Sequence, residues 1–183
     1  MRALFPILGL GLGLLLAPAA HAASLAGVTL PDTASVGGSQ LVLNGLGLRE
    51  KYMIDIYVGG LYLPSKTTDA DKAINDDVPK RIVMHMTYDL SKDKLAETMR
   101  DSLSKSADPE VSKHAGTLAS WMDDVADGDE IVLDYVPGKG CSVMVKGAVK
   151  GTLEGTPVMK GLWGVYLGPN PPTKNLKNGL LGK

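Results

Sequence analysis

Apolar residues recur along this chain with two periods, one of two residues and one close to 3.6 residues. Period two predicts strands, because successive side chains of a strand point to opposite faces, whereas the longer period predicts helices that pack by one face. The pattern predicts strands over 40–48, 51–63, 81–88, 130–136, 141–146 and about 148–153. It predicts helices from Ser91 through Leu103, from Pro109 to Gly128 and over about 157–166, with room for short helices in 65–80 and in the tail.

The order of these elements is strands, two helices, strands and a helix. Runs of one type followed by runs of the other are typical of the α+β class, in which helices cover one face of an antiparallel sheet. No repeat or linker interrupts residues 23–183, so we expect one domain there.

The first 22 residues have the pattern of a secretory signal peptide. Arg2 is their only charged residue, an apolar run follows, and Ala20-His21-Ala22 supplies the small-x-small cleavage pattern. The run over 3–17 is shorter than the roughly 20 apolar residues of a membrane span. We therefore predict export to the periplasm or the exterior, with no stable membrane span after cleavage.

Charge and cysteine content exclude several classes of function. The net charge is −1 at pH 7, and no basic stripe with interleaved aromatics is present, so we expect no nucleic-acid partner. Cys141 is the only cysteine, which rules out an internal disulfide, and its strand context indicates a small buried residue rather than a nucleophile. His85 and His114 lack companions at metal-ligand spacing, so neither a metal nor another cofactor is expected.

The segment "LNGLGLREKYMIDIYVGGLYLP", residues 43–64, combines core-like residues with charges. Arg49 offers five fixed donors that match a carboxylate or an enolate-like oxygen, but the residues alone favour a solvated turn residue paired with Glu50 or Asp55. We expect Asp55 to be exposed or paired, because burying a lone carboxylate is costly. The apolar positions change phase at Gly59-Gly60, which predicts a β-bulge there.

The same segment resembles the chalcone isomerase-like family, in which a Gly-x-Gly-x-Arg element precedes a strand ending like "VYVAGLYL". Later segments agree in order and spacing: "RIVMHMTYDLSKDKLAETM", "ASWMDDV", "GDEIVLDYVPGKG" and "GTLEGTPVMKGLWGVYLG". The similarity covers about residues 40–168 and is greatest to the exported bacterial branch of the family. It implies an open-faced β-sandwich, a long antiparallel sheet with helices layered on one face and a cleft between them.

The resemblance also implies candidate site residues. Arg49 matches the cleft arginine, Tyr57 falls where plant isomerases carry a water-ordering threonine, and Met159-Lys160 fall where those enzymes carry a hydroxyl pair. The catalytic tyrosine of the plant enzymes has no counterpart in "SADPEVSKHAGTLASW". The leading hypothesis is a non-catalytic binder of a small apolar or amphipathic carboxylate such as a fatty acid, with Arg49 setting its direction. The alternatives are an isomerase of the chalcone type that uses Arg49 and Tyr57, and an interaction domain with a closed cleft.

Overall fold

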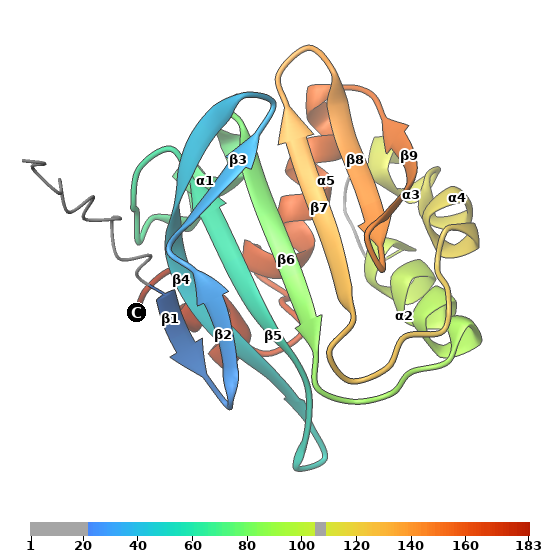
Figure 1. Cartoon of the computed structure of the whole chain (residues 1–183). Coiled ribbons are helices and arrows are strands. Elements are labelled where there is room, and N and C mark those ends of the chain that lie inside the picture. The colour runs from blue at the N-terminus through green and yellow to red at the C-terminus, as the bar shows by residue number, and fades with distance from the viewer. Residues whose placement is uncertain (1–21, 105–108) are drawn as a thin grey trace, which may run out of the picture.

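The computed structural model describes residues 22–104 and 109–183, so the predicted signal peptide lies almost entirely outside the described residues. Seven strands form one antiparallel sheet in the order β3-β4-β5-β6-β7-β8-β9, and β1 with β2 forms a separate hairpin (Figure 1). Every strand of the large sheet therefore pairs with its neighbour in sequence. The strands are β1 Ala22–Leu25, β2 Val28–Pro31, β3 Thr33–Val36, β4 Ser39–Lys51, β5 Ile54–Leu63, β6 Lys80–Met86, β7 Glu130–Val136, β8 Gly140–Val145 and β9 Ala148–Leu153.

The helices lie on one face of the sheet, as the predicted α+β class requires (Figure 1). They are α1 Ala70–Asn75, α2 Lys92–Ser104, α3 Pro109–Ser112, α4 Ala115–Ser120, α5 Thr156–Leu167 and α6 Lys174–Leu180. The side chain of Ser91 accepts a hydrogen bond from the Lys94 N–H at 3.3 Å, which confirms the predicted start of α2. No helix within these described ranges has both the length and the apolar character needed to cross a bilayer.

The chain before residue 37 contains three strands that the hydrophobic pattern did not predict. The β1–β2 hairpin covers part of the sheet face away from the helices, where Val28 and Leu30 pack in a second core with Val58 and Tyr62. The Tyr62 hydroxyl donates a hydrogen bond to the Pro31 carbonyl at 2.8 Å. Strands of four residues are too short to show a clear alternation, which explains why the pattern missed them.

The predicted bulge at Gly59-Gly60 is wrong, because Gly59 and Gly60 pair regularly with Gly47 and Leu46. The strand is buried on both faces, since Leu61 belongs to the core under the helices and Tyr62 to the core under the hairpin. Burial on both faces produces the continuous apolar run that looked like a phase change. The register shifts instead lie between Leu43 and Gly45 and between Arg49 and Glu50.

The predicted helix from Pro109 to Gly128 is also wrong in its extent. It consists of two short helices, α3 and α4, and it ends at Ser120. Val125, which the helical period included, forms an isolated bridge with Leu90 through two backbone hydrogen bonds of 2.9 Å. Val125 is therefore buried beside α2 because its backbone pairs with Leu90 as in a strand, and its agreement with the helical period of the sequence was coincidental.

The turn between β4 and β5 lies at Tyr52-Met53 rather than at Arg49-Glu50. Lys51 pairs with Ile54, so the loop has two residues, and both have positive φ, 53° and 63°. This is the geometry of a type I′ turn, for which Asn-Gly is the usual sequence. A left-handed conformation costs a non-glycine residue about 1–2 kcal/mol. The sequence Tyr-Met therefore gave no turn signal, and the connection was expected three residues too early.

Helix α6 lies directly against β4, with backbone touching backbone. A Cβ atom built on Gly47 would lie 2.2 Å from the Leu176 carbonyl oxygen, and one on Gly179 would lie 2.2 Å from the Leu46 carbonyl oxygen. The Asn44 amide also donates a hydrogen bond to the Leu180 carbonyl at 2.7 Å. The glycines before Arg49 therefore allow α6 to pack directly on the strand.

Lys80 is fully buried at the start of β6, which is rare for a lysine. Its ammonium donates hydrogen bonds to the Ala73 and Ile74 carbonyls of α1, at 2.8 and 3.2 Å. It also lies 5.7 Å from the centre of the Trp163 ring. Burial lowers the pKa of Lys80 to about 8, against the raising effect of Asp76.

We expect Lys80 to make the free energy of unfolding increase as the pH is raised from about 8, the pKa of Lys80 in the folded protein, to 10.5, the ordinary lysine pKa. In this window the folded protein has released the Lys80 proton while the unfolded chain retains it, so rising pH favours the folded state. Urea unfolding of the wild type and of Lys80→Met isolates this contribution. The free energy of the wild type minus that of the variant should grow by about 1–3 kcal/mol across the window.

The comparison with Lys80→Met is needed because Cys141 acts in the opposite direction. Burial raises the pKa of its thiol to about 12, so stability is lost as pH rises above the ordinary thiol range. Both proteins carry Cys141, so the effect of its burial is common to them, and the difference contains only the contribution of Lys80 together with its charge interaction with the thiol. A difference that stays constant between pH 8 and 10.5 would contradict the assignment to Lys80.

Candidate ligand-binding site

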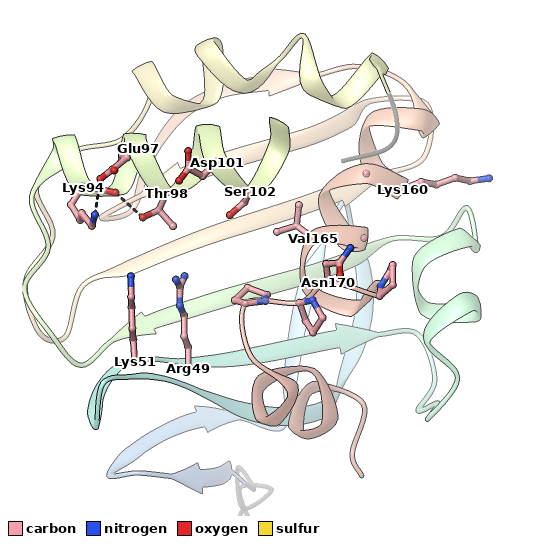
Figure 2. Close-up of a pocket in the computed structure, with 15 residues that line it drawn as sticks. Arg49, Lys51, Lys94, Glu97, Thr98, Asp101, Ser102, Lys160, Val165 and Asn170 are labelled. Atoms are coloured by element: carbon pink, nitrogen blue, oxygen red, sulfur yellow. Dashed lines mark hydrogen bonds and ion pairs between the residues drawn. The ribbon is translucent and has the colours of Figure 1, made fainter. Parts of the chain in front are cut away.

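Arg49 lies within β4, where it is paired across the sheet with Tyr57 of β5. Its guanidinium carbon is 5.7 Å from the centre of the Tyr57 ring. Figure 2 shows Arg49 and Lys51 rising side by side from the sheet toward α2. Within the described parts of the chain, no carboxylate pairs with either cation. Arg49 is therefore a half-buried strand residue without a carboxylate partner, not a solvated turn residue.

Two adjoining cavities lie between the sheet and helices α2 and α5. The outer cavity has a volume of about 600 Å³ and the inner one about 90 Å³. Arg49, Lys51 and Lys94 line both, which places these cations at the junction. The space thus passes from a polar vestibule to an apolar interior.

Apolar side chains from both layers line the inner cavity: Ile56, Met84, Met86, Leu90, Leu95, Met99, Met122, Ile131 and Val165. On the apolar stripe of α2, Leu103 is fully buried while Leu95 and Met99 are only half-buried. The first turns of α2 therefore stand over the cavity, and its last turn packs on the core. Four of the lining residues are methionines, whose unbranched side chains repack readily around a guest.

Two buried tyrosines, Tyr57 and Tyr166, lie beside Arg49 in the wall of the inner cavity. The Tyr57 O–H donates to no acceptor in the described structure, and the Tyr166 hydroxyl donates only to the weak acceptor Met84 Sδ at 3.4 Å. Burial raises the pKa of both hydroxyls, and the Arg49 charge opposes the rise. Both tyrosines therefore remain neutral donors at physiological pH. The Arg49 guanidinium has no carboxylate partner and the O–H beside it has no acceptor, and an anionic oxygen would serve both.

The vestibule carries more positive than negative charge. Arg49, Lys51 and Lys94 line it, against the two carboxylates of Glu97 and Asp101, and the ammonium of Lys160 at its edge points away. Lys94 and Glu97 of α2 neutralise one another at 2.6 Å, as Figure 2 shows. The remaining excess of positive charge favours an anionic group of a ligand at the mouth of the outer cavity.

The other candidates from the sequence fall outside the inner cavity. Met159 is fully buried in the core and does not line either cavity. Lys160 lines the outer cavity, but it is exposed and its side chain points away in Figure 2. Asp55 is exposed, as expected. Tyr166 reaches the inner cavity from α5, and no motif in the sequence marked it as a site residue.

Cys141 and the two histidines lie apart from the cavities. Cys141 is buried in β8, and its raised pKa keeps the thiol protonated. His85 Nδ1 is 3.2 Å from Glu130 Oε1 across β6 and β7. Across the described ranges, no three His, Cys, Asp or Glu side chains gather as metal ligands would. Arg49 and the tyrosines therefore carry the chemistry of the site.

Together, the sheet, its single helical layer and the half-buried arginine define an α+β protein with an amphipathic cavity between its layers. The chain belongs to the chalcone isomerase-like family, which it matches over residues 22–182. No curated protein matches the chain in sequence. Among solved structures it is similar to a fatty-acid-binding protein of Arabidopsis thaliana, with a TM-score of 0.68 and 20% identity over 88% of this chain and 96% of that one. This likeness is one of fold, and it confirms the open-faced β-sandwich.

Proposed function

We propose that this protein is a non-catalytic binder of an apolar carboxylate, such as a fatty acid. The carboxylate lies on Arg49 at the junction of the two cavities, and the apolar part extends into the inner one. One observation carries the proposal: the Arg49 guanidinium, which no described carboxylate pairs, lies beside the buried hydroxyl of Tyr57, whose O–H has no acceptor. A carboxylate accepts from both donors, and no described side chain does so.

Burial of the apolar part supplies most of the affinity. Each buried CH₂ group contributes about 0.8 kcal/mol, whereas a hydrogen bond to a charged group nets about 1.5–3 kcal/mol. The inner cavity, about 90 Å³, requires its methionines to move aside for a long chain. A plant protein of the same fold, described as a fatty-acid-binding protein, supports this ligand class.

Arg49 and Tyr57 would also suit the developing oxyanion of a chalcone isomerase reaction, which makes an intramolecular lyase the second candidate. Among the described residues lining the inner cavity, however, none is a carboxylate, histidine or cysteine that could activate the hydroxyl of Thr98 or Ser102 as a nucleophile. This lining favours binding over catalysis. An outer cavity of about 600 Å³ lined by Arg49 also argues against an interaction domain with a closed cleft.

The proposal includes export, for which the apolar run over 3–17 and Ala20-His21-Ala22 are the support. A periplasmic or secreted location would give the cavity access to lipids of the cell envelope.

Native mass spectrometry tests both the proposed binding of an acid and the proposed export. The full-length gene product is expressed and then recovered from the cell envelope. We expect a chain that begins at Ala23 and carries a bound acid, which dissociates on activation. Added fluorescent fatty acid should displace the bound acid. Empty protein together with no binding of the fluorescent acid would overturn the proposed function, and a chain that retains residues 1–22 would overturn export alone.

A further inference from the structure

The tip of the β4–β5 hairpin presents large apolar side chains to solvent. Tyr52 is 85% exposed, Met53 92% and Ile54 41%. The hairpin projects beyond the rest of the molecule at the lower end of Figure 1. These residues, which we term the apolar tip, are three of the five exposed large apolar residues in the described chain. Concentration at one protruding point distinguishes them from apolar residues scattered over a surface.

The backbone conformation of the apolar tip disfavours the residues found there. Tyr52 and Met53 both have positive φ, in a two-residue turn for which Asn-Gly would be unstrained and soluble. Strained backbone is retained mainly at functional sites. The turn therefore keeps two apolar side chains at a conformational cost, which folding alone does not explain.

The surroundings of the apolar tip indicate the kind of partner. The Lys51 ammonium lies 5.4 Å from the centre of the Tyr52 ring, so an apolar ring and a charged group lie together. Half-exposed Tyr88 follows at the base of the hairpin, where the Thr87 N–H donates to the Ile56 carbonyl at 3.1 Å. Tyrosine and lysine beside protruding apolar side chains are typical of the interface between a bilayer and water.

We propose that the apolar tip docks this protein onto a lipid bilayer by inserting Tyr52, Met53 and Ile54 among the headgroups. A narrow convex tip offers little of the roughly 800 Å² per partner that a stable protein interface buries, whereas a fluid bilayer adapts to a protrusion. Glu50 and Asp55 lie opposite one another on β4 and β5, directly behind the tip, and their negative charges offset the positive charge of Lys51. Insertion is therefore driven by apolar burial and needs no anionic lipid.

Docking at this point would place the candidate binding site beside the bilayer. Lys51 lines both cavities and directly precedes Tyr52, so the tip and the cavity mouth belong to the same strand end. An amphipathic acid could then pass between bilayer and cavity without crossing bulk water. This consequence rests on the proposed function, whereas docking itself does not.

Flotation of the purified protein with phosphatidylcholine vesicles, with and without phosphatidylglycerol, tests the proposal. The wild type should float with both kinds of vesicle. The double variant Tyr52→Asn/Met53→Gly should float at least tenfold less, because two apolar side chains are lost from the interface. Since Asn-Gly fits the turn, this variant should unfold at the same or a higher temperature, which separates docking from folding.

Val149→Ser is the matched control, because Val149 is exposed and apolar but lies on β9 at the far edge of the sheet. It should float as the wild type does. Absence of wild-type flotation, equal flotation of the double variant, or self-association that the double variant abolishes would each overturn the proposal. Fatty-acid binding measured without vesicles should be the same for wild type and double variant, and its absence would overturn the proposed function but not docking.

Discussion

Replacing Gly47 with alanine should lower the free energy of unfolding by about 3 kcal/mol or more, although only a methyl group is added. The new Cβ would lie 2.2 Å from the Leu176 carbonyl oxygen, and the obstructing atoms belong to the backbone of α6. A flexible side chain could rotate away, but a helix backbone has to shift as a unit. We therefore expect α6 to separate from β4, with loss of the hydrogen bond from Asn44 to the Leu180 carbonyl.

Guanidinium unfolding measures this loss, and Gly164→Ala is the matched control. Gly164 lies within α5, and a Cβ there meets no atom within 4 Å. Alanine is the better helix former by about 1 kcal/mol, so this variant should be as stable as the wild type or more stable. If Gly47→Ala unfolds within about 0.5 kcal/mol of the wild type, the proposed packing of α6 on β4 is wrong.

Replacing Arg49 with methionine should weaken the binding of palmitate about 10- to 100-fold. Among the described residues, Arg49 is the one arginine that lines the inner cavity. A charge-assisted hydrogen bond from its guanidinium to the carboxylate would contribute about 1.5–3 kcal/mol to binding. The affinity for hexadecanol, which has the same chain without the carboxylate, should change less than threefold. Titration calorimetry with both ligands separates loss of the head contact from damage to the cavity.

Arg100→Met repeats the same substitution on the exposed surface of α2, at a residue that lines neither cavity. It should leave both affinities unchanged. An equal loss for palmitate and hexadecanol in Arg49→Met would show that Arg49 supports the cavity without contacting the carboxylate. Unchanged palmitate binding would remove Arg49 from the site.

The sheet was predictable from sequence where the strands are long and apolar and polar residues alternate along them. The alternation in 81–88, 130–136 and 141–146 placed three neighbouring strands to within a few residues. The hydrophobic pattern failed to predict the β4–β5 turn and the regular pairing of β5, because the local sequence signals there were absent or misleading. Tyr52-Met53 lacks turn chemistry, and in β5 burial on both faces looked like a bulge.

The candidate site was less predictable, because it depends on distances between distant parts of the chain. Composition left Arg49 open as a turn residue, and the family pattern alone singled it out with Tyr57. Tyr166 reaches the same cavity from α5, more than a hundred residues later, so no spacing could associate it with Arg49. Met159 shows the limit of the family pattern, since matching a position does not place its side chain in the cavity.

The central claim is that a carboxylate lies on Arg49 inside this protein. Carbon-13 NMR of palmitate labelled at its carboxyl carbon tests it most directly, by following the bound resonance as pH is lowered. We expect one bound resonance, separate from that of free palmitate, and a bound carboxyl whose pKa lies below that of a solvent-exposed carboxyl because a nearby guanidinium favours the charged form. In Arg49→Met that lowering should disappear. The absence of a bound resonance, or a bound carboxyl that titrates identically in both proteins, would contradict the account.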